Sequence, residues 1–545
     1  MIFISEIKNQ LVWYHYPMQI ESAFTKDRAV LRFYLLLGLF FISRLIFLSP
    51  DPVFFDSPEY LRRLEMDDWP RSLIDGHPPF HTGYILLFWP IFHFGKFLGV
   101  NGAFLVVLTQ AILATFAIWC FYKSILLLAN RRIAIWASII ASALPLWWIV
   151  TDSVMMEAGY SSTFLISFYF FLLFLKKQNL AFFLTSMVFF FLALLTHIAV
   201  LFWIPLFFFA IFRISKNQRA KLIVYATAGF VATTIAIVYF LAHVGSLSLI
   251  ESASLIFLSK TGEHVEISLS AIGIAQLVRN TMVPMIVNNT SLIVILSIFS
   301  LFILWRKDKS YFFLGLLWIL PITITNNWWD SLLFGRHALL ASFGSAFLVG
   351  SLLEKSKKKF FIVIFYLLVV SLPAVTHLRQ PIPYIEEAAA VEKLPKGGLI
   401  LETHFARPQV EKKYEGKIIF VNEPGWDRAD TLEQIRTFLA SDRPVFVTSQ
   451  ALSDPYGLYS GPYIHSLSLS YAHPFVLQGI IDRFTLEKYK IISEKDNLLI
   501  YKVLNDNPSP YPEIKKVNQS RRRIDYFDPI TQLINIFKAR ANLKL

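Results

Sequence analysis

The sequence predicts a mainly α-helical, polytopic membrane protein, with a bundle of about eleven membrane-spanning helices and a C-terminal α/β domain outside the membrane. Composition and hydropathy predict the bundle. The 545 residues are 55% apolar and only 16% charged, with a mean hydropathy of +0.53, whereas soluble proteins carry about 25% charged residues. Apolar runs recur through residues 30–376, and the composition becomes polar after about residue 377.

The N-terminal segment 1–29 is mostly polar and shows no signal-peptide pattern. It carries Lys26 and Arg28 next to the first span, and the positive-inside rule predicts that it lies in the cytoplasm. Residues 30–376 form the predicted transmembrane domain, because a helix needs about 20 mainly apolar residues to cross the hydrocarbon core. The candidate spans are 30–48, 103–122, 132–150, 158–175, 180–196, 198–213, 222–243, 284–305, 311–328, 333–352 and 360–376.

The apolar run 82–98 is predicted to lie on the outer membrane surface, within an outer loop spanning 49–102. It carries Trp89-Pro90, His93 and Lys96, which suit an interfacial helix better than a lipid-facing span. If this run does not cross, the basic clusters between the spans all fall on the cytoplasmic side. The positive-inside rule favours that arrangement.

The net charge of +13 therefore does not indicate a nucleic-acid partner, because most of the excess lies in those short clusters. The chain has one cysteine, Cys120, in an apolar run, which excludes an intrachain disulfide and a cysteine metal site. We expect a multi-pass protein of a prokaryotic inner membrane, with its N-terminus in the cytoplasm.

Residues 377–505 are predicted to form a small α/β domain on the outer side. A helical pattern runs from Ala429 to Ala440, with apolar residues on one face. Strand-like segments flank it at 398–401, 417–421, 444–448 and 497–503. The tail 506–545 is basic and amphipathic, which suits either a position on anionic headgroups or a solvated tail.

The first candidate site residues are Asp56 and Glu59, directly after the first span. They are three residues apart, so on a helix both would face the same side. Such a pair can deprotonate and position an acceptor hydroxyl. The alternative is a solvated acidic loop, because Asp51, Glu65 and Asp67 are near in the sequence.

A second acidic pair, Asp152 and Glu157, follows the span 132–150 and is predicted to return to the same outer face. Asp152 would also serve as a helix N-cap, which is the structural alternative for a single aspartate. Glu157 lies about one turn into the next apolar run, and acids within the membrane are costly and usually functional.

Basic candidates complete the site. Arg336 and His337 open the span 333–352, where a guanidinium can hold a lipid-linked phosphate with two hydrogen bonds. The alternative is an arginine that marks the end of a helix. Arg279 lies in the predicted outer loop 244–283, and His77 lies in the first outer loop. The sequence leaves a metal site unassigned.

The order of these motifs resembles the C-type (GT-C) membrane glycosyltransferases, above all the protein O-mannosyltransferase and lipid A aminoarabinose transferase groups. Those families place an acid in the first outer loop, followed by a Pro-Pro motif; here these are Asp56-Ser57-Pro58-Glu59-Tyr60 and His77-Pro78-Pro79-Phe80. Asn130-Arg131-Arg132 matches their basic cytoplasmic turn, and Pro145 with Asp152 matches their second acidic turn.

Two positions depart from the pattern. His77 replaces the lysine that often precedes Pro-Pro in the aminoarabinose group, and His337 replaces the aromatic residue that follows the late arginine. The sugar and the acceptor therefore stay open. The resemblance covers about residues 30–350, and the C-terminal domain matches no module of the family.

The resemblance implies an inverting transfer of a sugar from a polyprenyl-phosphate donor to a protein, lipid or glycan acceptor on the outer face. In this hypothesis Asp56 is the general base, Glu59 or Asp152 orients the acceptor, and Arg336 stabilises the leaving phosphate with His77 or Arg279. No cofactor is required, and a divalent metal is compatible with it. A lipid-linked glycan polymerase or ligase and, in another class, a secondary transporter are the alternatives.

Overall fold

The computed structural model describes most of the membrane bundle and much of the C-terminal domain. The described residues are 28–49, 57–75, 81–215, 217–245, 247–257, 277–278, 281–282, 284–286, 289–328, 339–377, 383–403, 406–411, 413–421, 427–452, 483–493 and 498–504.

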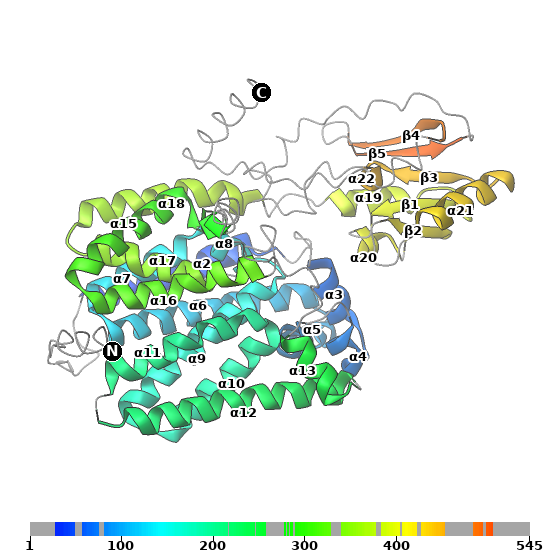
Figure 1. Cartoon of the computed structure of the whole chain (residues 1–545). Helices are drawn as coiled ribbons and strands as arrows, with labels where there is room; N and C mark the ends of the chain where they lie inside the picture. Colours follow the sequence, from blue (N-terminus) through cyan, green and yellow to red (C-terminus); the bar gives the residue numbers. More distant parts are fainter. Residues whose placement is uncertain are drawn as a thin grey trace.

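The bundle consists of long helices that lie side by side (Figure 1). Each predicted span overlaps a helix of the structure. The helices are α2 (Arg28–Phe47), α6 (Gly102–Leu128), α7 (Arg131–Ala143), α8 (Pro145–Thr151), α9 (Met156–Lys177), α10 (Leu180–Thr196), η1 (Ile198–Trp203), α11 (Ile204–Ile214), α12 (Arg219–Gly245), α15 (Ser291–Lys307), α16 (Lys309–Trp328), α17 (Leu340–Leu352) and α18 (Lys357–His377).

Within the described residues, three helices are long and apolar enough to cross a membrane, namely α6, α9 and α12. The pair α7 and α8 would form a fourth span, although a bend of 65° separates its halves. The bend has a local cause: Pro145 opens α8, and the residue before a proline is pushed out of the helical region. Other apolar helices are shorter, so the count of about eleven spans stays a prediction.

Helix α9 forms the centre of the bundle. Nearly all of its residues are buried, and it packs against α6 and α10. Phe207 of α11 stacks edge-on against Phe164, Phe168 and Phe171 of α9. Aromatic rings in this geometry attract one another beyond the area that they bury. The abundant phenylalanine therefore fills the core of the bundle here.

Short helices cover one end of the bundle: α3 (Ser57–Glu65), α4 (Trp69–Ile74) and α5 (Thr82–Phe97), with α13 (Leu249–Phe257) beside them (Figure 1). The predicted surface segment 82–98 is thus a helix. Its inner face packs against α6, α10 and α3, and Gly83 lets its backbone approach α10, since a Cβ there would lie 2.6 Å from the Thr196 nitrogen. Its place on the membrane surface stays a prediction.

The C-terminal part contains a five-stranded sheet in the order β2-β1-β3-β5-β4. Strands β1 (Leu399–Thr403), β2 (Lys417–Val421) and β3 (Val445–Thr448) are parallel. Strands β5 (Leu498–Val503) and β4 (Leu486–Ser493) extend the sheet in antiparallel fashion. The predicted helix is present as α21 (Arg428–Ala440), and the four strand-like segments are strands.

Helices cover both faces of this sheet. Ile435 and Phe438 of α21 pack on the face that carries Leu401 and Val447. Side chains alternate across a strand, so Ile400 and its neighbours face α19 (Pro383–Val391) instead. The short helices α20 (Arg407–Val410) and α22 (Ser449–Leu452) complete the unit, and α20 lies next to α3 of the bundle. The outer-side position of this domain stays a prediction.

Two carboxyl groups meet inside the domain. Glu387 of α19 and Glu402 near the carboxyl end of β1 are both fully buried. The Thr448 hydroxyl donates a hydrogen bond to Glu402 Oε1 at 2.7 Å. Burial, reinforced by the neighbouring Glu402, raises the pKa of Glu387 well above its ordinary value, and Thr448 opposes this effect. Folding therefore favours the protonated form of Glu387.

Candidate active site

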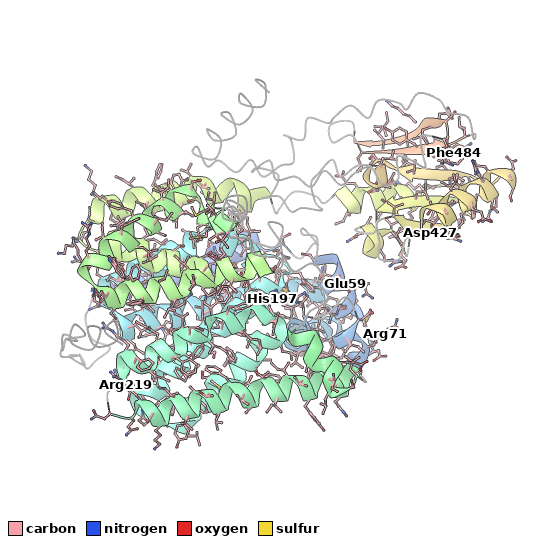
Figure 2. All side chains as sticks on the ribbon, viewed as in Figure 1. Glu59, Arg71, His197, Arg219, Asp427 and Phe484 are labelled. Carbon is pink, nitrogen blue, oxygen red and sulfur yellow. The ribbon has the colours of Figure 1, made fainter. Side chains whose placement is uncertain are left out.

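The candidate acids of the described chain gather at the end of the bundle that α3, α4 and α5 cover. Glu59 lies on α3, Asp152 follows α8, and Glu157 lies in the first turn of α9. Figure 2 labels Glu59 and His197 at this end. The other candidates lie outside the described residues; they are Asp56, His77, Arg279, Arg336 and His337.

Glu59 is engaged by Arg62 on the surface of α3. Two guanidinium nitrogens of Arg62 donate to the Glu59 carboxylate at 2.7 and 2.9 Å, and the third donates to Asp75 at 2.5 Å. All three side chains are about one-third exposed. The hydrogen bond to Glu59 is the main cause that raises the pKa of Arg62. Glu59 therefore faces a permanent positive charge.

Arg63, the next residue, fixes α3 to α4 from the inside. It is buried, and it donates to the carbonyl oxygens of Ser72 and Leu73 at 2.9 Å each. Burial lowers the pKa of Arg63 to about 10. Satisfying a buried guanidinium with main-chain carbonyls limits the cost of removing it from water. Arg63 thus joins α3 to α4 on the buried side, and Arg62 joins α3 to Asp75 at the end of α4 on the exposed side.

Asp152 lies in the interior and faces Arg44 at the end of α2. The Arg44 Nε and Asp152 Oδ1 atoms are 3.5 Å apart, and both side chains are at most 1% exposed. Asp152 is not the N-cap of α9, because that helix begins at Met156 after Met155. Asp152 instead ends α8. Its partner is the Arg44 guanidinium in the last turn of α2.

Glu157 is also fully buried, at the start of α9. It interacts electrostatically with Tyr84 of α5, whose ring packs against Gly159 of α9. The Tyr84 hydroxyl donates to Gln110 at 3.0 Å, and the Gln110 amide donates to two main-chain carbonyls, those of Val150 and Ser153, at 2.7 and 2.6 Å. A polar network thus links α5, α6 and the α8–α9 turn beside Glu157.

Two histidines face one another across this end. The rings of His81 and His197 are nearly parallel, with centroids 5.7 Å apart. The Thr196 carbonyl lies 3.0 Å from His81 Nδ1, which must carry the proton because a carbonyl only accepts. The Ala199 N–H donates to His197 Nδ1 at 3.1 Å, so a neutral His197 carries its proton on Nε2. The pair is therefore oriented by main-chain contacts.

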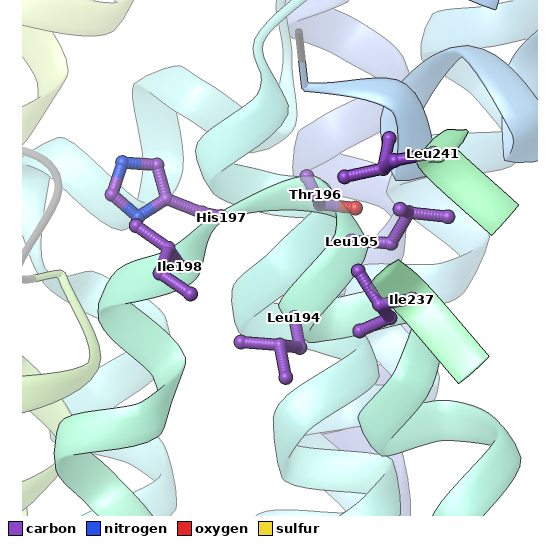
Figure 3. Close-up of a pocket in the computed structure, with 7 residues that line it drawn as sticks. All are labelled: Leu194, Leu195, Thr196, His197, Ile198, Ile237 and Leu241. Carbon is purple, nitrogen blue, oxygen red and sulfur yellow. The ribbon is translucent and has the colours of Figure 1, made fainter. Parts of the chain in front are cut away.

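A small cavity lies beside His197, where α10 ends (Figure 3). Its volume is about 20 Å³, which is room for one water molecule. Figure 3 shows the imidazole pointing away from the apolar side chains of Leu194, Leu241 and Ile237. A second, larger hollow of about 420 Å³ is an apolar groove between α2 and α6, lined by Leu37, Phe41, Ile112, Thr115, Phe116 and Trp119.

Sequence reasoning missed Arg44 and Gln110. Each is a polar side chain within an apolar run, and that is the signal by which it could have been found. Sequence reasoning also did not pair Asp152 with a cation. Among the residues that the structure describes, no group of three or more His, Cys, Asp or Glu side chains is placed to hold a metal ion.

The fold is similar to that of two proteins of known structure. ArnT from Cupriavidus metallidurans in the apo state matches 87% of this chain over 98% of its own, with 12% sequence identity and a TM-score of 0.51. The oligosaccharyltransferase of Archaeoglobus fulgidus, in a complex with Zn and sulfate, matches 87% of this chain over 74% of its own, with 11% identity and a TM-score of 0.50.

The chain has the GT-C fold. At this level of identity the likeness establishes the fold alone, and it agrees with the resemblance of the sequence motifs. ArnT has also been solved with undecaprenyl phosphate bound, a structure that gives a TM-score of 0.48 with this chain. No protein-family model matches the chain, and no curated protein matches it in sequence.

Proposed function

We propose that this GT-C protein is a membrane glycosyltransferase that moves a sugar from a polyprenyl-phosphate donor to an acceptor on the outer face. The observation that carries the proposal is the fold shared with ArnT over nearly the whole length of that enzyme. The order of acids and basic residues along the sequence supports it independently.

The proposed reaction is a single displacement with inversion. Asp56 takes the proton of an acceptor hydroxyl as its oxygen attacks the anomeric carbon of the sugar. The bond between that carbon and the phosphate oxygen breaks, and polyprenyl phosphate leaves with the electron pair. Arg336, with His77 or Arg279, stabilises the negative charge on the leaving phosphate. This scheme requires no metal ion.

The described residues support a site at this end of the bundle. Ser57, which follows Asp56 in the chain, donates its hydroxyl proton to the Val154 carbonyl at 2.8 Å. Val154 is two residues from Asp152 and three from Glu157. The two acidic segments that the sequence singled out therefore adjoin one another, although 97 positions separate the bonded residues.

The test is a transfer assay on the purified full-length protein with polyprenyl-phosphate mannose, related monosaccharide donors and a lipid-linked oligosaccharide. We expect Asp56→Asn to lower the rate of transfer by about 10²–10⁴-fold, because a general base contributes on that order. Asp67→Asn is the matched control, since Asp67 belongs to the same loop and is 93% exposed.

Undiminished transfer by Asp56→Asn would remove Asp56 from the role of base. Transfer from the oligosaccharide donor alone would identify a polymerase or ligase. If no lipid-linked donor is used and liposomes containing the protein take up a solute, the protein is a transporter instead.

A further inference from the structure

We propose that Arg44 and Asp152 are a positioning pair, which holds the chain on both sides of Asp56 against the turn between α8 and α9. The expected effect of the pair on the rate of transfer rests on the proposed function, whereas its expected effect on the structure of this region does not. In it Asp152 acts through the protein and not on the substrate, so the second acid of the sequence motif has a different role from the first.

Arg44 joins three helices at the end of α2. Besides its contact with Asp152, it donates from Nη2 to the Ser142 carbonyl of α7 at 3.0 Å. Its guanidinium carbon lies 3.9 Å from the Phe40 ring centroid and 4.6 Å from that of Trp148. Cations over aromatic faces are attracted more strongly when water is excluded. Arg44 is 1% exposed, so these contacts fix its side chain in one place.

The main chain of the same region attaches to the α8–α9 turn. The Ser49 N–H donates to the Asp152 carbonyl at 2.7 Å, and Ser49 forms a parallel bridge with Ser153. Ser57 attaches to Val154 through its hydroxyl. Residues 49 and 57 are therefore both fixed to residues 152–154, and Asp56 belongs to the chain between these two anchors.

The buried Asp152 carboxyl group depends on Arg44 for a compensating charge. Asp152 Oδ2 has no hydrogen-bond partner among the described residues, and the nearest cation that the structure gives to this carboxylate is Arg44. A buried charge that loses its partner is strongly destabilising, whereas replacing both partners by apolar side chains of similar volume is often tolerated. We therefore expect the loss of either partner alone to destabilise the fold, and the replacement of both by apolar side chains to be tolerated.

Hydrogen exchange of the full-length protein tests the positioning role without any assay of activity. The variant is Arg44→Met/Asp152→Leu, and the matched control is Arg132→Met, the same change at an exposed contact with the Glu354 carbonyl. We expect peptides that cover residues 45–60 to exchange at least tenfold faster in the double variant, with α9 unchanged, and no change in the control. Unaltered exchange of 45–60 in the folded double variant would overturn the proposal.

Kinetics separates positioning from direct action on the substrate. If the pair acts as a unit, Arg44→Met and Arg44→Met/Asp152→Leu lower kcat by similar factors with little effect on KM for the donor, and Arg44→Lys restores part of the loss. A much larger loss in Asp152→Asn than in Arg44→Met would overturn the assignment, because Asp152 would then act on the substrate. If the wild type transfers no sugar but the exchange result holds, the proposed function fails and the positioning pair stands.

Discussion

Two regions of this protein bury carboxyl groups in opposite ways. At the end of the bundle, Asp152 faces the guanidinium of Arg44 at 3.5 Å. In the sheet domain, Glu387 faces a second acid, Glu402, and burial raises its pKa. The first arrangement balances charge with charge, and the second needs a proton. The same chain therefore contains one acid buried beside a cation and another buried beside a second acid.

The ion pair of Arg44 and Asp152 and the acid pair of Glu387 and Glu402 are expected to affect the structure around them differently. An ion pair between distant helices fixes their relative position, because the two charges must stay together. We expect the sheet domain to respond to pH through Glu387.

The largest expected effect is the loss of one member of the ion pair. Arg44→Met leaves Asp152 buried without its cation, and we expect the free energy of unfolding to fall by about 3–5 kcal/mol. Thermal unfolding of the purified protein in detergent measures this loss. The double variant Arg44→Met/Asp152→Leu should recover most of it. Equal losses in the single and double variants would contradict the ion-pair interpretation.

The second prediction concerns pH and the sheet domain. The pKa of Glu387 is raised on folding, so the folded state holds the proton more tightly than the unfolded chain does. This contribution is full below the ordinary value of 4.5 and is lost as pH rises through the raised pKa. The domain should therefore be more stable at pH 5 than at pH 8. Proteolysis during a temperature ramp, read on fragments of the sheet, measures the difference.

Glu387→Gln sharpens this prediction, because a glutamine is neutral at every pH. We expect the variant to be more stable than the wild type at pH 8 and to lose the pH dependence that Glu387 supplies. Glu392→Gln is the control, since Glu392 is half-exposed and pairs with Lys413 at 3.1 Å. If Glu392→Gln flattens the pH profile as much as Glu387→Gln does, the buried pair is not its source.

The smallest expected effect belongs to the surface network of Arg62. Its partners Glu59 and Asp75 are about one-third exposed, and exposed ion pairs contribute about 0–1 kcal/mol each. Arg62→Gln should lower the free energy of unfolding by about 1 kcal/mol or less, and by still less in 0.5 M salt because salt screens exposed charges. A loss as large as that of Arg44→Met would remove the distinction between buried and surface pairs.

The sequence predicted the helices well because long apolar runs dominate it. It did not predict the bend between α7 and α8, since hydropathy treats 132–150 as one run although Pro145 interrupts it. It also missed α19 and the edge strand β4. The strand Leu486–Ser493 has Glu487, Lys488 and Lys490 among its residues, and such charged edge strands lack the apolar signal of a central strand.

The candidate site was less predictable than the fold, for a different reason. The sequence identified Asp152 and Glu157 as unusual, and both are fully buried. It could not identify Arg44 as the partner, because no local pattern relates residues on α2 to the end of α8. The roles of Asp56, His77, Arg279, Arg336 and His337 stay predictions, since these residues lie outside the described parts of the chain.

The single cysteine has a practical consequence. Cys120 is fully buried in α6, so the native chain presents no accessible thiol to an impermeant maleimide. A cysteine introduced at an exposed position would therefore be the accessible thiol of this protein, and Cys120 would not have to be replaced first. Introduced at Phe97, the 83% exposed last residue of α5, a thiol would report in intact cells on which side of the membrane that helix lies.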